Sequence, residues 1–317
     1  MTTTYRLRVE EINKVFTSRK SFKKTHFQAV QDVSFNLKDK EVLAIVGESG
    51  SGKSTTARIL TNLIKPTSGE IYYDGISIKD KKFQRVLPER VQMIFQDPFA
   101  ALNPHHSIGY AIGRPLQLRG KSEGSIRKKV LELLTQVGLT PAEDFIDKYP
   151  YQISGGQKQR VIIARVLGLE PEIIVADEPT SMLDVSIGIE IMNLLLDLRD
   201  NRNLSFILIT HNLGSARYMA DRIMVMYAGE IVEIGDSEEV INDPKHPYTK
   251  LLLQSSPDPW KENNTLIEAI EPSKTALPKM GCKFQNRCPF ATEECRKSSI
   301  PFYSLSNERQ VRCNLYN

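Results

Sequence analysis

The chain has 317 residues, of which 40% are hydrophobic and 25% are charged, and this balance excludes a collagen-like, mainly disordered or disulfide-dense protein. Lysine and arginine exceed aspartate and glutamate by only 42 to 38, which gives no ground for a nucleic-acid partner. The apolar runs are a few residues long, whereas a membrane span needs about 20, and the N-terminus has no apolar signal core. We therefore expect a cytoplasmic protein that does not itself cross a bilayer.

The first part of the chain is rich in predicted strands. Alternating or continuous apolar residues predict strands over residues 5–9, 33–37, 41–46, 71–73 and 91–95. The basic run 18–24 is typical of a solvated loop, with a contact to anionic lipid headgroups as the alternative.

A phosphate-binding loop follows the strand at 41–46. Residues Gly47–Ser54 match the pattern G-x-x-x-x-G-K-[ST], and a helix is predicted from Lys53 to Leu63. The glycines allow the backbone N–H groups to surround phosphates, and the helix N-terminus adds partial positive charge. Lys53 is expected to reach the β- and γ-phosphates, and the Ser54 hydroxyl is expected to bind Mg²⁺.

Two acidic residues follow a later buried strand. The pattern is helical from about residue 100 to residue 169, and the continuous apolar runs 173–176 and 206–209 then predict strands that are buried on both faces, with a crossover helix over 187–198. Asp177 and Glu178 emerge at the carboxyl end of the first run, where ligands of α/β sheets gather. We expect Asp177 to hold Mg²⁺ through a water and Glu178 to polarise the attacking water.

The four cysteines, Cys282, Cys288, Cys295 and Cys313, all lie in the last 36 residues. A closing pair of strands over 223–234, broken at Gly229, precedes this region, and the regular strand–helix alternation ends after Gly235. The cysteine spacings of five, six and seventeen residues fit zinc poorly, because zinc sites usually have two to four residues within a pair. Four thiolates suit an iron–sulfur cluster, and zinc, free thiols or disulfides remain the alternatives.

Further motifs resemble those of the ATP-binding-cassette (ABC) family. Residues Ser154–Gln157 are similar to its S-G-G-Q signature, Gln96 to its glutamine loop and His211 to its switch histidine. Ser181–Asp184 resembles its D-loop, usually S-A-L-D, from which Met182 departs. Phe16 occupies the usual place of the aromatic residue that stacks on adenine, with Phe22 and Phe27 nearby.

The resemblance implies an α/β fold: a P-loop nucleotide-binding domain with a RecA-like core, an antiparallel β subdomain and a helical signature subdomain, followed by a cysteine-containing extension. We expect the ATPase domain over residues 1–235, its helical subdomain at about 97–168, and the extension over 236–317. The signature of one cassette would complete the ATP site of a partner cassette. The residues implied to contact ATP are Phe16, Gly47, Ser49, Gly50, Ser51, Gly52, Lys53, Ser54, Thr55, Gln96, Ser154, Gly155, Gly156, Gln157, Asp177 and Asp184.

The implied catalytic residues are Glu178, His211 and Gln96; the implied Mg²⁺ ligands are Ser54, Gln96 and Asp177; and the four cysteines are implied to hold a 4Fe-4S cluster.

The C-terminal segments resemble those of ATPase subunits of bacterial oligopeptide and dipeptide importers. The C-terminal segments with this similarity are His246–Lys250 and Gly281–Ala291, and Tyr227–Glu233 and Leu102–Pro104 fit the same group. The segment between Phe16 and Ala29 is more similar to the second, F-type, of the two ATPases of such importers. The resemblance implies a transport ATPase on the cytoplasmic face of the membrane, with a second, related ATPase, two permease subunits and an extracytoplasmic binding protein as partners, and no nucleic acid.

Three alternatives stay open at this point. Similar importers take up nickel chelates, glutathione, opines or sugars. A soluble ABC ATPase of DNA repair or translation usually has tandem cassettes or coiled-coil insertions, and this chain has one phosphate loop and no heptad array. A nucleotide-responsive regulator that does not hydrolyse ATP would not need Glu178 and His211.

Overall fold

The computed structural model describes residues 5–20, 23–255, 277–278, 280–306 and 308–317. It is a mixed α/β structure with two compact units, and the first unit combines both ends of the chain. This unit contains the residues up to Ser77 and those from Leu208 onward, and the second unit contains Ile78–Ile207.

An antiparallel sheet of the first unit begins with a long hairpin. Its strands, in the order β2-β1-β4-β5, are β1 (Tyr5–Lys20), β2 (Lys23–Lys38), β4 (Ser68–Tyr73) and β5 (Ile76–Ser77). The predicted pairing of the first strands is confirmed, with Leu7 opposite Leu37. The predicted loop is wrong at residues 18–20 and 23–24, because the ladder continues there with Ser18 opposite Thr25 and Lys20 opposite Lys23. The strand hydrogen bonds thus extend into basic residues whose polarity alone favours a loop.

The second sheet of this unit supports the phosphate loop and the C-terminal residues. It contains β3 (Val42–Val46), β9 (Arg222–Tyr227), β10 (Glu230–Asp236), β11 (Tyr303–Ser304) and β12 (Gln310–Val311), in the order β11-β12-β10-β9-β3. β3 and β9 are parallel, whereas β10 pairs antiparallel with both β9 and β12. The last strands of the chain thus belong to the same sheet as β3, the strand that precedes the phosphate loop.

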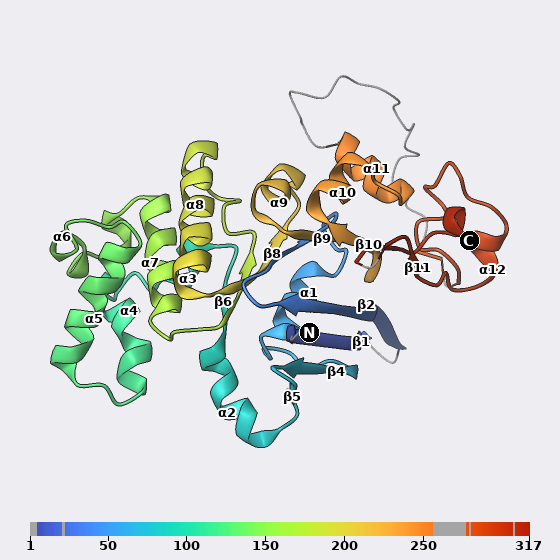
Figure 1. Ribbon diagram of the computed structural model, residues 1–317. Helices are drawn as coiled ribbons and strands as arrows, with labels where there is room; N and C mark the ends of the chain where they lie inside the picture. The colour runs from blue at the N-terminus through green and yellow to red at the C-terminus, as the bar shows by residue number, and fades with distance from the viewer. Residues whose placement is uncertain (1–4, 21–22, 256–276, 279, 307) are drawn as a thin grey trace. The chain divides into compact units, whose positions relative to one another are not determined.

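Short helices complete the first unit (Figure 1). They are α1 (Lys53–Leu60), α9 (Leu213–Met219), α10 (Ser237–Asn242), α11 (Pro247–Gln254), α12 (Glu294–Lys297) and the 3-10 turn Asn314–Tyr316. Helix α1 begins at Lys53 as predicted but ends three residues before Leu63, because Asn62 takes a left-handed conformation with φ 55°.

The second unit contains a group of helices and two parallel strands. Its elements are α2 (Lys81–Arg90), β6 (Val91–Ile94), α3 (Pro98–Ala101), α4 (Ile108–Leu118), α5 (Glu123–Gln136), α6 (Glu143–Ile146), the 3-10 turn Pro150–Gln152, α7 (Gly155–Leu167), β7 (Ile173–Asp177) and α8 (Val185–Arg202). Helices α3, α4 and α5 pack against α7, and α6 packs against α5 and α4. β6 and β7 pair in parallel, with Val91 opposite Ile173.

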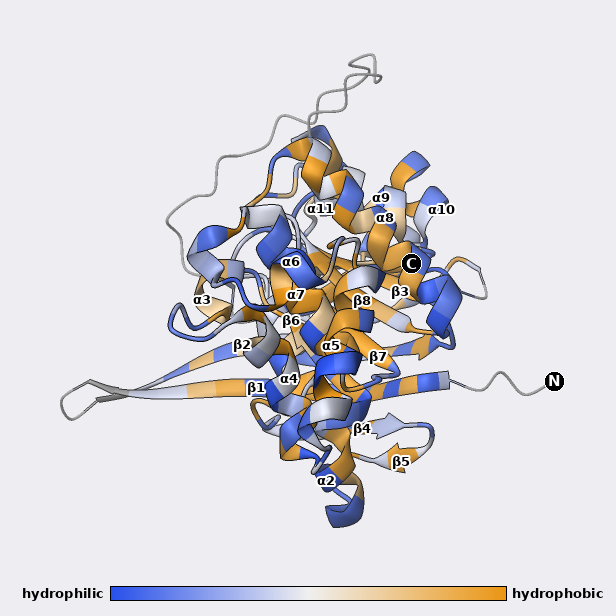
Figure 2. Ribbon diagram, turned by 90° about the vertical axis from the view of Figure 1, so that its left-hand side faces the viewer, coloured by the Kyte–Doolittle hydropathy of each residue, from blue (hydrophilic) through white to orange (hydrophobic). Residues whose placement is uncertain are grey.

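The buried strands have the hydrophobic runs from which they were predicted. β7 is fully buried, and β8 (Ser205–Thr210), which crosses the boundary between the units, is also buried along its length. Both strands are coloured as mainly hydrophobic in Figure 2. In the described part of the chain, no helix is long and apolar enough to span a membrane.

Candidate functional site

The phosphate loop connects the buried strand β3 to helix α1 in the first unit. Two of its glycines are required by close backbone contacts: a Cβ at Gly47 would lie 2.2 Å from the carbonyl oxygen of Met226, and one at Gly52 would lie 2.5 Å from that of Ala29. Gly52 is also the N-cap of α1, with φ 104°. The loop therefore has a backbone path that only glycine permits at these two positions.

Polar groups of the loop converge around its lysine. The buried Lys53 donates through Nζ to the carbonyl oxygens of Gly47 (2.7 Å) and Glu48 (2.9 Å). Ser51 is 3% exposed, and its Oγ has no hydrogen-bond partner among the described residues. Ser49 and Gly50 are exposed at the loop surface, and Ser54 is half-buried. A buried ammonium beside an unpaired hydroxyl is suited to an anionic ligand that accepts hydrogen bonds.

The acidic pair lies at the end of β7 in the second unit. Asp177 is the buried last residue of the strand, and Glu178 follows with a left-handed backbone (φ 47°). Gln96 follows β6, the strand beside β7, and donates from Nε2 to Oε2 of Glu178 over 2.9 Å. The structure thus joins two predicted site residues that are 82 positions apart in sequence.

The predicted signature residues form the start of α7. Ser154 is the N-cap, and its Oγ accepts a hydrogen bond from the N–H of Gln157 (3.3 Å), while Gln157 Oε1 accepts from the N–H of Ser154 (3.0 Å). A Cβ at Gly155 would lie 3.5 Å from Leu183 of the predicted D-loop. This capping box holds the exposed Ser154 at a helix N-terminus, where partial positive charge is available to an anion.

The remaining predicted residues are at exposed positions. His211 follows β8 and precedes α9, whose N-cap Asn212 accepts a hydrogen bond from the N–H of Ser215. Asp184 is the exposed N-cap of α8. Phe16 lies on β1 opposite Phe27, is 42% exposed, and has the Lys14 ammonium 5.2 Å from its ring centre. Phe22 lies outside the described residues.

The predicted residues are distributed over both units. Phe16, the phosphate loop, Thr55 and His211 belong to the first unit; Gln96, the signature, Asp177, Glu178 and Asp184 belong to the second.

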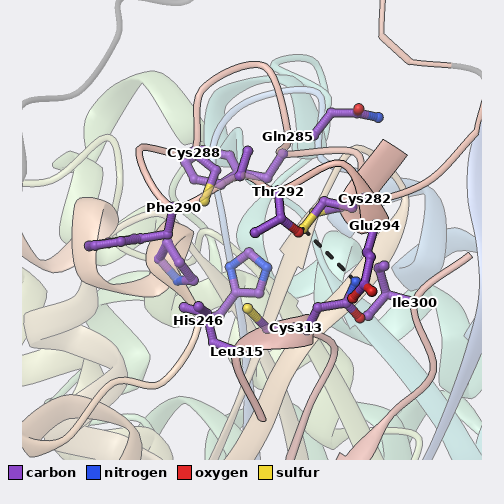
Figure 3. A pocket seen from close by; sticks show the side chains of 15 residues that line it. His246, Cys282, Gln285, Cys288, Phe290, Thr292, Glu294, Ile300, Cys313 and Leu315 are labelled. Carbon is purple, nitrogen blue, oxygen red and sulfur yellow. Dashed lines mark hydrogen bonds between the residues drawn. The ribbon is translucent and has the colours of Figure 1, made fainter. Parts of the chain in front are cut away.

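The four cysteines surround one cavity of about 100 Å³ in the first unit. Burial raises the pKa of Cys282 to about 12 and that of Cys288 to about 11, and it also raises the pKa of Cys313. In Figure 3 the sulfur atoms of Cys288 and Cys313 turn towards the space beside the His246 imidazole. Among the described residues, no three His, Cys, Asp or Glu side chains are placed to hold a single metal ion.

The sequence interpretation missed the residues that connect this cavity to the phosphate loop. His246 lines the cavity, and its Nδ1 accepts a hydrogen bond from the N–H of Tyr248 at the start of α11. Burial lowers the pKa of His246 to about 3, so the imidazole is neutral. Tyr248 and Arg287 both contact Glu48 of the phosphate loop. Both segments, His246–Lys250 and Gly281–Ala291, stood out in the sequence only by their family resemblance, and Pro247 after His246 is typical of a helix start; neither signal assigned these residues a contact with the phosphate loop.

Comparisons with known proteins match both parts of the chain. The ABC transporter family model matches residues 30–181, and that of the oligopeptide/dipeptide transporter C-terminal region matches residues 232–295. The chain is 42% identical over 294 residues to the di/tripeptide transport ATP-binding protein DppF of Pseudomonas aeruginosa, covering 90% of each protein. It is 40% identical over 321 residues to the oligopeptide transport ATP-binding protein AppF of Bacillus subtilis, covering 98% of this chain and 97% of AppF.

Solved structures match the fold. The cbiO1 structure from Clostridium perfringens, part of the ABC transporter complex cbiONQ, has a TM-score of 0.66 and 33% identity, and covers 76% of this chain and 92% of cbiO1. The dimeric ATP-binding cassette MJ0796, bound to ADP and Pi, has a TM-score of 0.64 and 32% identity, and covers 73% of this chain and 98% of that one. The predicted fold class is confirmed.

Proposed function

Since the chain belongs to the ABC transporter family and has the C-terminal region of its oligopeptide/dipeptide members, we propose that it is the ATP-hydrolysing motor subunit of a peptide importer. Relatives named DppF, OppF and AppF support an F-type subunit, and relatives named DppD match at 37–40% identity as well. The single structural observation that carries the proposal is the hydrogen bond from Gln96 to Glu178 at the end of a buried strand.

In this proposal the phosphate loop binds the triphosphate. Lys53 exchanges the carbonyl oxygens of Gly47 and Glu48 for phosphate oxygens, and the unpaired hydroxyl of Ser51 becomes satisfied. The other contacts to ATP come from Gly47, Ser49, Gly50, Gly52, Ser54 and Thr55, and from Phe16, which stacks on the adenine. Hydroxyl, amide and carboxylate oxygens fit Mg²⁺, so Ser54, Gln96 and Asp177 would hold the ion, which neutralises phosphate charge when bound.

Glu178 is proposed as the general base for the attacking water. The hydrogen bond from Gln96 orients its carboxylate before the substrate binds. His211 and Asp184 would contact the phosphate region and the partner cassette, respectively.

A second cassette is proposed to complete the site. Ser154, Gly155, Gly156 and Gln157 lie at the N-terminus of α7, and an anion at this helix end is stabilised by the helix dipole. The dimeric cassette MJ0796 among the structural matches supports such pairing. Closure of the dimer on ATP would drive transport, and hydrolysis would reopen it.

The membrane part of the importer is proposed to be other chains. We propose two permease subunits that hold this chain on the cytoplasmic face, a related ATPase as dimer partner, and an extracytoplasmic binding protein that delivers the solute. Import of nickel chelates, glutathione or another small solute is the alternative with the same motor chemistry. A role in DNA repair or translation is disfavoured by the match to the peptide-transporter C-terminal region.

We further propose that Cys282, Cys288, Cys295 and Cys313 hold a 4Fe-4S cluster. The observation that supports this proposal is that all four cysteines line one cavity. Four thiolates from one folded region suit such a cluster. When bound, the cluster would supply a structural cross-link and stabilise thiolates that burial otherwise disfavours.

Replacement of Glu178 by glutamine tests the motor assignment. Glutamine keeps an acceptor oxygen for Gln96 but is not a base, so ATPase activity of the assembled complex should fall by about 10²–10⁴-fold while ATP still binds. Uptake of a labelled dipeptide should stop. Glu190→Gln, which alters an exposed glutamate of α8 paired with Arg160, is the matched control. Normal ATP hydrolysis by Glu178→Gln would contradict the motor assignment. If the parent complex hydrolyses ATP but takes up no peptide, only the assignment of peptides as the transported solute would be contradicted.

The cluster has a separate test. Protein purified without oxygen should be brown and contain iron and acid-labile sulfide, and replacement of Cys288 by serine should remove both. A colourless protein that contains zinc would contradict the cluster.

A further inference from the structure

Glu48, the first variable residue of the phosphate loop, has all three of its polar groups engaged. Its carbonyl oxygen accepts a hydrogen bond from Lys53, and its backbone N–H donates to the hydroxyl of Tyr248 over 2.7 Å. Its carboxylate accepts two hydrogen bonds from Arg287, at 2.9 and 3.0 Å. Tyr248 and Arg287 come from the C-terminal region of the chain, about 200 or more residues away.

Arg287 is held in place by the turn that bears two of the cysteines. The N–H of Gln285 donates to the carbonyl oxygen of Cys282, and the N–H groups of both Arg287 and Cys288 donate to that of Phe284. The guanidinium lies 5.5 Å from the ring centre of Phe284, and its side chain is only 11% exposed. The cysteine-bearing turn therefore fixes where the positive charge is placed.

Tyr248 provides the second attachment from the same region. It is fully buried, and its ring lies 4.6 Å from that of Tyr227 and 5.5 Å from that of Phe284. Its hydroxyl meets Glu48 at the backbone, whereas Arg287 meets the side chain. Glu48 is thus restrained by two contacts that belong to one aromatic cluster.

The carboxylate of Glu48 is unfavourable for an anionic ligand. ATP brings several negative charges to the loop of which Glu48 is part, and like charges repel over about 10 Å at about 0.1 M salt and farther at lower salt. The Arg287 guanidinium forms a two-pronged pair with this carboxylate and cancels its charge. The hydrogen bonds to Glu48 in turn raise the pKa of Arg287, so the guanidinium stays charged.

We propose that Arg287 is a positioning residue for ATP: it neutralises and restrains Glu48, and thereby makes the turn Cys282–Cys288 a determinant of nucleotide affinity. The proposal rests on ATP binding at the phosphate loop and does not depend on which solute is imported. Under this proposal, a structural change in the turn Cys282–Cys288 alters the affinity for ATP. By the same coupling, ATP binding alters the stability of that turn.

The test is a double-mutant cycle read as the Kd of a fluorescent ATP analogue on the full chain. Arg287→Met keeps contact with the aromatic rings but removes the charge, and should weaken binding by about five- to tenfold at low ionic strength. Glu48→Gln should bind the analogue at least as tightly as the parent chain, because it removes the repelling carboxylate. The double variant should recover most of the affinity that Arg287→Met loses.

Two further measurements separate charge from folding. Arg312→Met is the matched control, because Arg312 also lies over an aromatic ring, that of Phe302, but pairs with Glu230 of β10. It should leave the Kd unchanged, and added salt should reduce the defect of Arg287→Met.

Defined outcomes would overturn the proposal. An unchanged Kd for Arg287→Met would do so, and so would a double variant as weak as Arg287→Met alone. If Arg287→Met does not fold, weaker binding by Glu48→Gln than by the parent chain would be the refuting result.

Discussion

Replacing Arg309 by methionine should remove the buried charge that fixes the end of the chain to β10. Arg309 is 7% exposed at its side chain, and its Nη2 donates to Oε1 of Glu233 over 3.1 Å and to the carbonyl oxygen of Asp243. Glu233 is completely buried. The substitution therefore leaves a buried carboxylate without its cation.

The structure sets the magnitude of this effect. Removing one partner of a buried ion pair costs about 3–5 kcal/mol of unfolding free energy. Glu233 keeps hydrogen bonds from the N–H groups of Lys245 and His246, at 3.0 and 2.9 Å, so we expect a value near the lower end, about 3 kcal/mol. Combining Arg309→Met with Glu233→Gln should recover about 1–2 kcal/mol, because the amide needs no counter-charge.

The assay is urea unfolding followed by circular dichroism at neutral pH, with slopes compared between variants. Arg217→Met, which breaks an exposed pair with Glu238, is the control and should leave the unfolding midpoint nearly unchanged, because water and salt screen an exposed pair. A loss below about 1 kcal/mol for Arg309→Met would refute the reasoning, as would a double variant no more stable than the single one.

Two other substitutions test the signature helix and the neutral histidine. Ser154→Ala removes the cap of α7 and should cost about 1 kcal/mol; Ser107→Ala, which removes the equivalent cap of α4, should cost the same, but only Ser154→Ala should lower ATPase activity in the dimer. Equal ATPase activity of the two variants would contradict a signature role. Burial lowers the pKa of His246 to about 3, so between pH 6.5 and 3 the unfolded chain binds a proton that the folded chain does not, and stability falls as the pH falls. From pH 7.5 to pH 5 the parent should lose about 2 kcal/mol more than His246→Asn, which keeps a helix-capping oxygen; equal losses in thermal or urea unfolding would exclude this effect.

The buried strands and the acidic pair could be predicted because one physical cause determines both. A continuous apolar run such as 173–176 must be covered on both faces, so the polar residues that follow it, Asp177 and Glu178, emerge at the strand end. Parallel pairing of β6 with β7 then places Gln96 beside Glu178. Their contact follows from the parallel pairing of these two strands, which the sequence pattern does not give.

Other features had no local signal. The basic run 18–24 looked like a loop, and its strand pairing depends on the register that starts near Leu7 and Leu37. The left-handed backbone of Glu178 is a tertiary effect, since glutamate does not favour positive φ. Arg287 and Glu48 are 239 residues apart, and neither spacing nor composition predicts their contact.

The position of Glu48 explains how an extension can affect a loop whose sequence is otherwise constrained. A side chain at Gly47 or Gly52 would clash with the backbone of Met226 or Ala29, respectively. A substitution at either glycine would therefore disturb the fold as well as phosphate binding. Lys53 is proposed to bind the phosphates, so its substitution would remove the site itself. Glu48 is a variable position of the motif, is 41% exposed at its side chain, and is held by groups outside the loop. A contact at Glu48 can change the charge near bound ATP without altering the residues proposed to bind the phosphates. The double-mutant cycle of Glu48 and Arg287 therefore measures a change in ATP affinity in a chain whose phosphate-binding residues are intact.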